Sequence, residues 1–303
     1  MSRPRSSITS LCVTVLVLAG CASTTPYVGQ GPHSQITRGA AIPPLDFLGN
    51  ILSLEGKIIL WNRHFNSHSV SPETEKYLTS FLDSRERPAF EKAIFRLNQY
   101  APIADLKALA RNRYMAWPYR LLLGLPVTLL TDVLLPGRVF PWGDYFNPFT
   151  NVAHLYSDDP AIALHEAGHA WDFSDFPYKG TYALLRSVPF MDLYQEQYAT
   201  TEAVNYLIEI KDRREELHAY KVLWPAYGTY IGAYVPLPLG SAIGAVVGHV
   251  FAWIKVHERK KFYKRMDAVL TGNSPSQIKK EDSTLLPTLR DASEVESLSQ
   301  GPH

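Results

Sequence analysis

The pentapeptide His165-Glu166-Ala167-Gly168-His169 constrains the fold of this chain more than any other stretch. On an α-helix, side chains four positions apart lie on one face, so both imidazoles can bind the same metal ion. Glu166 then points towards the open coordination position of that ion, where a general base is needed. The pattern therefore predicts a helix that carries a zinc site, and it favours a metal-dependent hydrolase.

A catalytic zinc ion needs three protein ligands and one open position, so a third ligand must come from elsewhere in the chain. Residues 191–207 predict a continuous helix with several small side chains, and Glu196 on this helix is the first candidate. Glu202 is six positions further on, about 240° round the helix, which makes it an alternative ligand and not a co-ligand. Asp175, six residues after His169, is the second alternative.

Residues 150–156 precede the metal motif and predict a β-strand that follows a turn-forming segment at 143–148. Such a strand can lie at a sheet edge, where it could pair with an extended peptide substrate, or it can be covered on both faces. His154 on this strand is a candidate donor to a developing oxyanion, although a structural role is favoured for it. Tyr194 and Tyr198 are the other candidate donors.

These segments together resemble the zincin metallopeptidases, and the gluzincin branch of that family in particular. The resemblance rests on the H-E-x-x-H motif, on the strand that runs directly into it, and on Glu196 followed by Ala199, which matches the E-x-x-A pattern of the gluzincins. It covers roughly residues 150–207. Thr200 stands where those enzymes usually have the aspartate that hydrogen-bonds to the first histidine. Asp175 stands where a related branch, the metzincins, has its third ligand.

The resemblance implies an α+β fold that is mostly helical, with a zincin-like core, a short edge strand before the H-E-x-x-H helix and a second ligand-bearing helix. It implies that His165, His169 and Glu196 bind Zn²⁺ and that Glu166 activates a water molecule for attack on a peptide bond. The expected protein is a zinc metallopeptidase with a peptide or protein substrate. The alternative is a non-catalytic scaffold or binding module whose metal site is degenerate or structural, and a structural site needs a fourth protein ligand.

Residues 1–20 have the features of an export signal, with two arginines ahead of an apolar run at 8–18 that is too short to span a membrane. The next residue completes Leu-Ala-Gly-Cys, which resembles the lipobox of bacterial lipoproteins; an ordinary secretory signal with an incidental cysteine is the alternative. The lipobox resemblance implies cleavage before Cys21 and acylation of its thiol and its new amino group. These acyl chains would anchor the mature chain to a membrane.

The same resemblance places the mature chain in the bacterial cell envelope. Ala22 is similar to the residue that follows the cysteine in lipoproteins sent to the outer membrane, so the periplasmic face of that membrane is the expected location. The net charge of +1, from 30 basic and 29 acidic residues, argues against a nucleic-acid partner. Nothing in the sequence indicates an oligomeric state.

Composition divides the mature chain into three parts. Residues 21–42 are small, polar and punctuated by Pro and Gly, and they predict a flexible tether. Residues 271–303 are rich in Ser and in charged side chains and predict a disordered tail. Residues 43–270 predict a single, mostly helical domain, in which Pro88 marks the start of a helix that continues to residue 97.

Two apolar stretches need a separate explanation. Residues 119–136 are interrupted by Pro126 and Asp132, which favours a buried core segment over a membrane span. Residues 239–256 have glycines at every fourth position (240, 244 and 248), which predicts one flat face for close helix packing. This Gly-rich helix can be a membrane span, which would place the chain in the inner membrane, or a buried helix of the domain, and both interpretations stay open.

Overall fold

The computed structural model describes residues 33–236 and 239–271. The expected signal peptide, the expected acylation at Cys21, the first part of the tether and the tail from residue 272 lie outside the described residues. The chain divides into two compact units, Met1–Ile254 and Lys255–His303. The boundary between the two units falls within the last helix, where apolar residues give way to charged ones, and the single domain expected at 43–270 stays a prediction.

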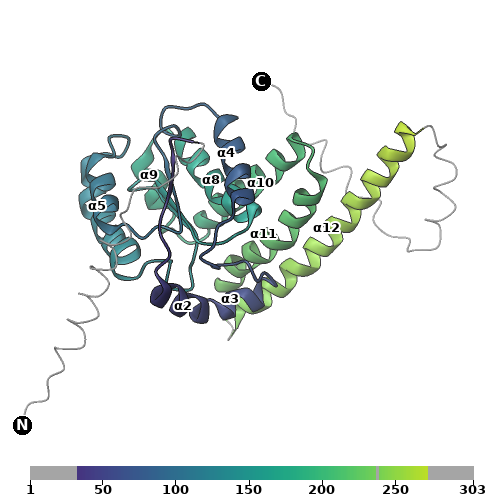
Figure 1. Ribbon diagram of the computed structural model, residues 1–303, viewed down its shortest axis with the longest axis horizontal. Helices are drawn as coiled ribbons and strands as arrows, with labels where there is room; N and C mark the ends of the chain where they lie inside the picture. Colours follow the sequence, from purple (N-terminus) through teal and green to yellow (C-terminus); the bar gives the residue numbers. More distant parts are fainter. Residues whose placement is uncertain (1–32, 237–238, 272–303) are drawn as a thin grey trace, which may run out of the picture. The chain divides into compact units, whose positions relative to one another are not determined.

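The described part of the chain is mostly helical and has one small mixed sheet (Figure 1). In chain order the elements are β1 (Ile36–Arg38), α2 (Pro43–Leu52), α3 (Leu54–Ile59), α4 (Pro72–Asp83), β2 (Ile94–Leu97), α5 (Pro102–Arg111), α6 (Trp117–Tyr119), the π-helical η1 (Arg120–Gly124), α7 (Leu125–Thr128), the π-helical η2 (Leu129–Leu134), β3 (Tyr145–Asn147), β4 (Val152–Leu155), α8 (Pro160–Asp175), α9 (Lys179–Leu185), α10 (Met191–Glu209), α11 (Arg213–Ala233) and α12 (Gly240–Leu270). The mostly helical α+β class expected from the sequence is confirmed.

The four strands are arranged in the order β1-β2-β4-β3. The first three are parallel and β3 is antiparallel to β4, with Phe95 of β2 opposite Ala153 of β4. The strand expected at 150–156 is therefore an interior strand, and the prediction that it forms a substrate-binding edge was wrong. Its neighbour β3, immediately before it in sequence, is one of the two edge strands, and β1 is the other.

Two further predictions about these strands were wrong. Residues 36–38, expected to belong to the flexible tether, form β1 and pair with β2. The helix expected from Pro88 to residue 97 is a turn followed by β2, in which Phe95 and Leu97 are fully buried. The strand has only four residues, with Arg96 between Phe95 and Leu97, and so short a run does not distinguish the period of a strand from that of a helix.

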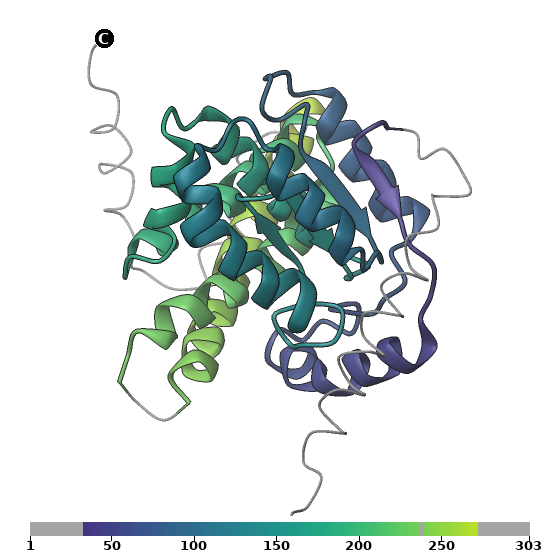
Figure 2. The ribbon, with the colours of Figure 1, turned by 90° about the vertical axis from the view of Figure 1, so that its left-hand side faces the viewer.

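Helices cover both faces of the sheet. On one face, Phe146 of β3 packs against Phe173 of α8, with ring centroids 5.6 Å apart. On the other face, His154 of β4 is directed towards Asp132 of η2. Figure 2 shows α5 and the segment 117–134, coloured blue to teal, in front of the strands. Helix α8 carries the H-E-x-x-H motif, and we call it the metal helix. It packs against the sheet and also against the helices α4, α10 and α11.

The segment 117–134 does not bury its leucines, contrary to expectation. Leu121 and Leu122 are 53% and 69% exposed, whereas Gly124, Thr128 and Asp132 are buried. These three small or polar residues are spaced by four positions and lie on one face of the segment. On this face Asp132 accepts hydrogen bonds from Tyr145 and Asn147 of β3. The apolar residues of the segment therefore did not identify the face that is buried.

The glycine spacing in residues 239–256 predicted the packing of α12 correctly. A Cβ atom added to Gly244 would lie 2.0 Å from the carbonyl oxygen of Gly228 in α11, and one added to Gly248 would lie 2.5 Å from that of Trp224. Another face of α12 carries Val246 and Val250, which are 61% and 53% exposed. Within residues 33–236 and 239–271, no helix is both long and apolar enough to span a membrane.

Candidate metal centre

The metal helix α8 begins where the sequence predicts. The Asp159 side chain caps it by accepting a hydrogen bond from the Ala161 amide at 2.9 Å, and Pro160 occupies the first helical position. The same carboxylate accepts hydrogen bonds from Asn62 and His218, at 2.7 and 2.9 Å. The start of α8 is thus joined to two other segments of the chain.

Gly168 lets the two ligand-bearing helices approach each other. A Cβ atom at this position would lie 2.9 Å from the carbonyl oxygen of Ala199 and 3.0 Å from its Cα atom. Any side chain would therefore push α8 away from α10. This contact explains a glycine in the interior of a helix, where it costs about 1 kcal/mol relative to alanine.

This packing brings His165, His169 and Glu196 together. His165 Nε2 lies 3.1 Å from Glu196 Oε2, and His169 Nε2 lies 3.3 Å from Glu196 Oε1. Ligand atoms from the three residues all lie within 4.8 Å of one another. Glu196, the first candidate from the sequence, is therefore the carboxylate next to the two histidines.

The two alternative ligands lie elsewhere and have other partners. Glu202 accepts hydrogen bonds from the guanidinium of Arg85, at 2.9 and 3.1 Å. Asp175 is 63% exposed and forms an ion pair with Arg87 at 3.0 Å. Neither carboxylate belongs to the group formed by the two motif histidines.

The donor set and its spacing fit a zinc ion. Two imidazole nitrogens and one carboxylate are the ligands of the His₂Glu class of catalytic zinc sites. Ligands about 2.0–2.1 Å from a tetrahedral ion are about 3.3 Å from one another, close to the 3.1 and 3.3 Å between His165, His169 and Glu196. A fourth protein donor is missing from this group among the described residues, as in a catalytic site.

Glu166 lies beside these ligands, in a cavity of about 450 Å³ that we call the metal cavity and that His165, Glu166 and Glu196 help to line. The Glu166 side chain is buried, and its Oε2 atom has no hydrogen-bond partner within the described structure. Burial raises the pKa of Glu166 to about 7. A carboxyl group in this setting can accept and release a proton near neutral pH.

Two further residues hold the ligands in place. Thr200 Oγ1 lies 3.3 Å from His165 Nδ1, so the hydroxyl occupies the position of the aspartate that it replaces in the gluzincin pattern. Arg186 donates a hydrogen bond to Glu196 Oε1 at 2.8 Å. Burial alone would raise the pKa of Glu196. Electrostatic interactions with His169 and Arg186 instead bring this pKa well below its usual value.

The predicted oxyanion donors do not line the metal cavity. His154 is buried on the opposite face of the sheet, stacked on Tyr145. Tyr194 is 63% exposed, and neither it nor Tyr198 belongs to the cavity wall. These assignments were wrong because closeness in sequence was taken for closeness in space.

Sequence reasoning missed the residues that do complete the wall. Tyr227 and Tyr230 of α11 line the metal cavity, and the negative charge of Glu196 raises the pKa of Tyr230. Asp144, which also lines it, accepts hydrogen bonds from the amides of Tyr156 and Ser157 at 2.6 and 2.9 Å. None of these residues belongs to a sequence motif. The tyrosines lie in an apolar helix, where the pattern indicated only packing.

A second group of possible ligands, Asp105, Asp132 and His154, is buried on the far side of the sheet. Arg96 donates a hydrogen bond to Asp105 at 2.8 Å, and Asp132 accepts hydrogen bonds from Tyr145 and Asn147, both at 2.8 Å. Arg96 thus supplies a positive charge to the group, while Asp105 Oδ2 and His154 Nε2 have no hydrogen-bond partner within the described structure. We interpret the group as a buried polar network that joins the sheet to the helices on that face.

The chain matches no protein-family model, no curated protein and no solved structure. Any function must therefore be inferred from its own side chains. At the metal cavity these are two imidazoles and a carboxylate at zinc-ligand spacing, with a second carboxylate beside them.

Proposed function

We propose that this chain is a zinc-dependent hydrolase, and more specifically a metallopeptidase of the bacterial cell envelope with a zincin-like core. One observation carries the proposal: Glu166, buried and with an unpartnered carboxylate oxygen, lies in the same cavity as a three-residue zinc-ligand set. A general base next to an open metal position is the arrangement that hydrolysis requires.

His165, His169 and Glu196 would hold the metal ion. Zinc would supply Lewis-acid polarisation of the scissile carbonyl and would lower the pKa of the attacking water. Arg186 occupies Glu196 Oε1, so Oε2 is the oxygen left to bind the ion. With the ion bound, Thr200 Oγ1 would accept a hydrogen bond from the Nδ1–H group of His165, which leaves Nε2 free for coordination.

Glu166 acts as the proton carrier. Its carboxylate accepts a proton from the attacking water and transfers it to the leaving amine, which must be protonated before it departs. The raised pKa suits both steps, because a base near neutral pH can also return the proton. Tyr230, which lines the metal cavity and whose pKa is raised by the negative charge of Glu196, is our candidate donor to the oxyanion.

The substrate class follows from two considerations. Amide hydrolysis matches the chemistry of a His₂Glu site with a glutamate base, which also serves the zinc peptidases. The export signal and the lipobox-like sequence place the expected substrates, peptides or proteins, in the bacterial envelope. A structural zinc site is not favoured, because His154 and Asp175, the possible fourth ligands, both lie outside the ligand group.

The substitution Glu166→Gln tests the proposal. The variant should bind one zinc ion per chain with unchanged affinity and should lose hydrolysis of fluorescein-labelled casein by at least about 10³-fold. Glu209→Gln, on an exposed carboxylate of α10, is the matched control and should retain full activity. Turnover by the Glu166→Gln variant would refute the role of Glu166 as the base. Absence of hydrolysis by the wild-type chain, or a zinc ion with four protein ligands by X-ray absorption, would favour the non-catalytic scaffold.

A further inference from the structure

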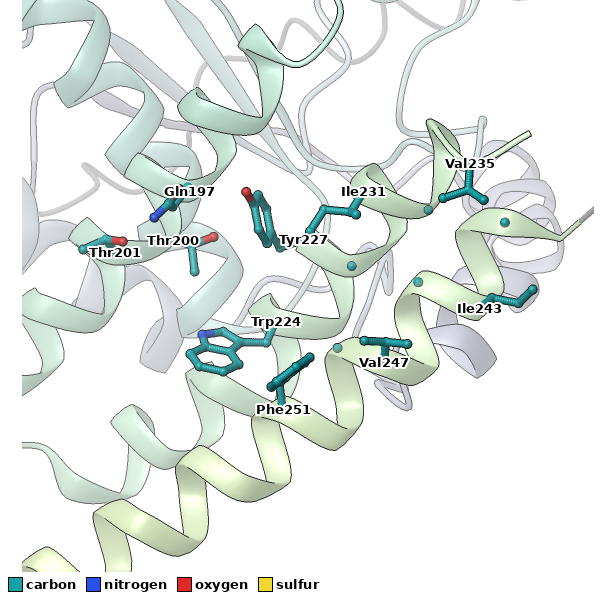
Figure 3. Close-up of a pocket in the computed structure, with 15 residues that line it drawn as sticks. Gln197, Thr200, Thr201, Trp224, Tyr227, Ile231, Val235, Ile243, Val247 and Phe251 are labelled. Atoms are coloured by element: carbon teal, nitrogen blue, oxygen red, sulfur yellow. The ribbon is translucent and has the colours of Figure 1, made fainter. Parts of the chain in front are cut away.

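An apolar groove of about 530 Å³ lies next to the metal cavity, between α10, α11 and α12 (Figure 3). Trp224 and Tyr227 of α11 and Val247 and Phe251 of α12 form much of its wall. None of the residues that line it carries a charged side chain. A groove of this size is within the range of roughly 300–1,000 Å³ that buries a drug-sized ligand.

The floor of this apolar groove is the contact between the backbones of α11 and α12. Gly228 and Gly244 meet there without side chains, and a Cβ atom on Gly244 would lie 2.0 Å from the Gly228 carbonyl oxygen. The space above them is therefore left open, while Trp224 and Phe251 stand at its side (Figure 3). Apolar walls without charge favour an apolar ligand, since burying a charge here would be costly.

The groove borders the metal cavity. Thr200 and Tyr227 line both, and Thr200 is also the residue whose hydroxyl lies 3.3 Å from His165 Nδ1. A ligand held in the groove is therefore in contact with a wall of the metal cavity. This shared wall distinguishes the groove from an unrelated surface hollow.

Polar side chains on one wall indicate a peptide ligand. Gln197 and Thr201 of α10 are exposed, lie one helical turn apart and line the groove. Their amide and hydroxyl groups can hydrogen-bond to the main chain of a peptide while its side chains contact the apolar wall. A hydrocarbon chain would make no use of these groups.

We infer that the groove binds a run of bulky apolar residues of a peptide substrate, next to the bond that is cleaved. This inference rests on the proposed metallopeptidase function and names its substrate class. The groove thus selects aliphatic and aromatic side chains and rejects acidic ones. Binding can be measured without turnover, so the selectivity and the hydrolysis can fail independently.

The test uses the zinc-loaded, full-length Glu166→Gln protein and two dansylated octapeptides, one with Leu-Phe-Leu and one with Ser-Asp-Ser at the centre. Affinity is measured by energy transfer from tryptophan. The variant Val247→Asp places a charge in the groove, and Val250→Asp is its matched control: the two valines are 48% and 53% exposed on the same helix, but only Val247 lines the groove. Circular dichroism and zinc content establish that each variant is folded.

We expect the apolar peptide to bind at least about tenfold more tightly than the acidic one. Val247→Asp should weaken the apolar peptide about tenfold or more, and Val250→Asp should change its affinity by less than about twofold. Equal affinities for the two peptides, or equal effects of the two variants, would overturn the inference. Displacement of the peptide by palmitate at a lower concentration than by the unlabelled peptide would also overturn it, in favour of an acyl ligand.

These outcomes are separate from the test of the proposed function. Casein hydrolysis by the wild-type chain without any peptide preference would support the metallopeptidase function and refute the proposed role of the groove. Selective peptide binding without any hydrolysis would support the groove as a peptide-binding site and refute the enzymatic function.

Discussion

The substitution Gly168→Ala tests whether the close packing of α8 and α10 sets the zinc affinity independently of the stability of the fold. The added methyl group would lie 2.9 Å from a carbonyl oxygen of Ala199, about 0.5 Å inside ordinary contact distance, and a backbone atom cannot rotate away. Helices α8 and α10 must therefore move apart by a few tenths of an ångström. Because Glu196 is on α10 and the histidines are on α8, the ligands separate by a similar amount.

Metal sites tolerate deviations of only about 0.2 Å in ligand distance, so the zinc affinity of Gly168→Ala should fall by about tenfold or more. Overpacking costs about 1–3 kcal/mol, and the better helix propensity of alanine returns about 1 kcal/mol. The metal-free protein should therefore lose only about 0–2 kcal/mol of unfolding free energy. The two quantities are measured by competition with a chromophoric chelator and by urea unfolding.

Gly248→Ala is the control for this experiment. Its added methyl group would lie 2.5 Å from the Trp224 carbonyl oxygen, a closer approach than at Gly168, but it separates α11 from α12 and leaves the ligand helices together. This variant should be the less stable of the two and should bind zinc normally. Wild-type zinc affinity in Gly168→Ala, or an equal loss of affinity in both variants, would refute the reasoning.

Four further substitutions test other parts of the structure. Glu196→Gln should abolish high-affinity zinc binding, whereas Glu202→Gln should leave it intact and cost about 1–3 kcal/mol of stability, because its arginine partner stays partly buried; chelator competition and urea unfolding measure both. Thr200→Val keeps the side-chain shape but removes the hydrogen bond to His165, so zinc affinity should fall by about 10–100-fold with little change in melting temperature. Burial raises the pKa of Asp132 from 3.8 to about 6 in the folded protein. The folded state therefore binds this proton more tightly than the unfolded state does. The contribution of the bound proton to stability is lost as the pH rises from about 4 to 6. Asp132→Asn should therefore give a shallower fall of melting temperature over that interval, and an unchanged slope would contradict this assignment.

The helix that carries His165 and His169, and the carboxylate that lies beside them, could be predicted because their geometry is contained in short, continuous segments. The four-residue spacing of His165 and His169 defines one helix face, and the small residues near Glu196 allow a close helix contact. Gly168 indicates that contact by its place inside a helix, and the glycines of α12 indicate the contact with α11 by their spacing. In each case the spacing of residues within one segment is enough to predict which face of the helix makes the contact.

The rest of the site depends on contacts between distant segments. Arg186 donates a hydrogen bond to Glu196 from a loop, and Tyr230 lines the metal cavity from α11; neither position stands out by spacing or composition. The strand at 94–97 was mistaken for a helix, because so short a run of apolar residues fits either period. The segment 117–134 faces the sheet with small and polar residues, since Asp132 has partners there that hydropathy does not represent.

Asp159 makes the beginning of the metal helix part of a larger cooperative unit. One carboxylate caps α8 and accepts hydrogen bonds from Asn62 and from His218 of α11. The first turn of α8 therefore cannot fray while its cap is held by two other segments, and release of α11 would remove the cap at the same time. In native-state hydrogen exchange, the amides at the start of α8 should open together with those of α11, so that the metal ligands are lost in a single step and not by gradual unwinding.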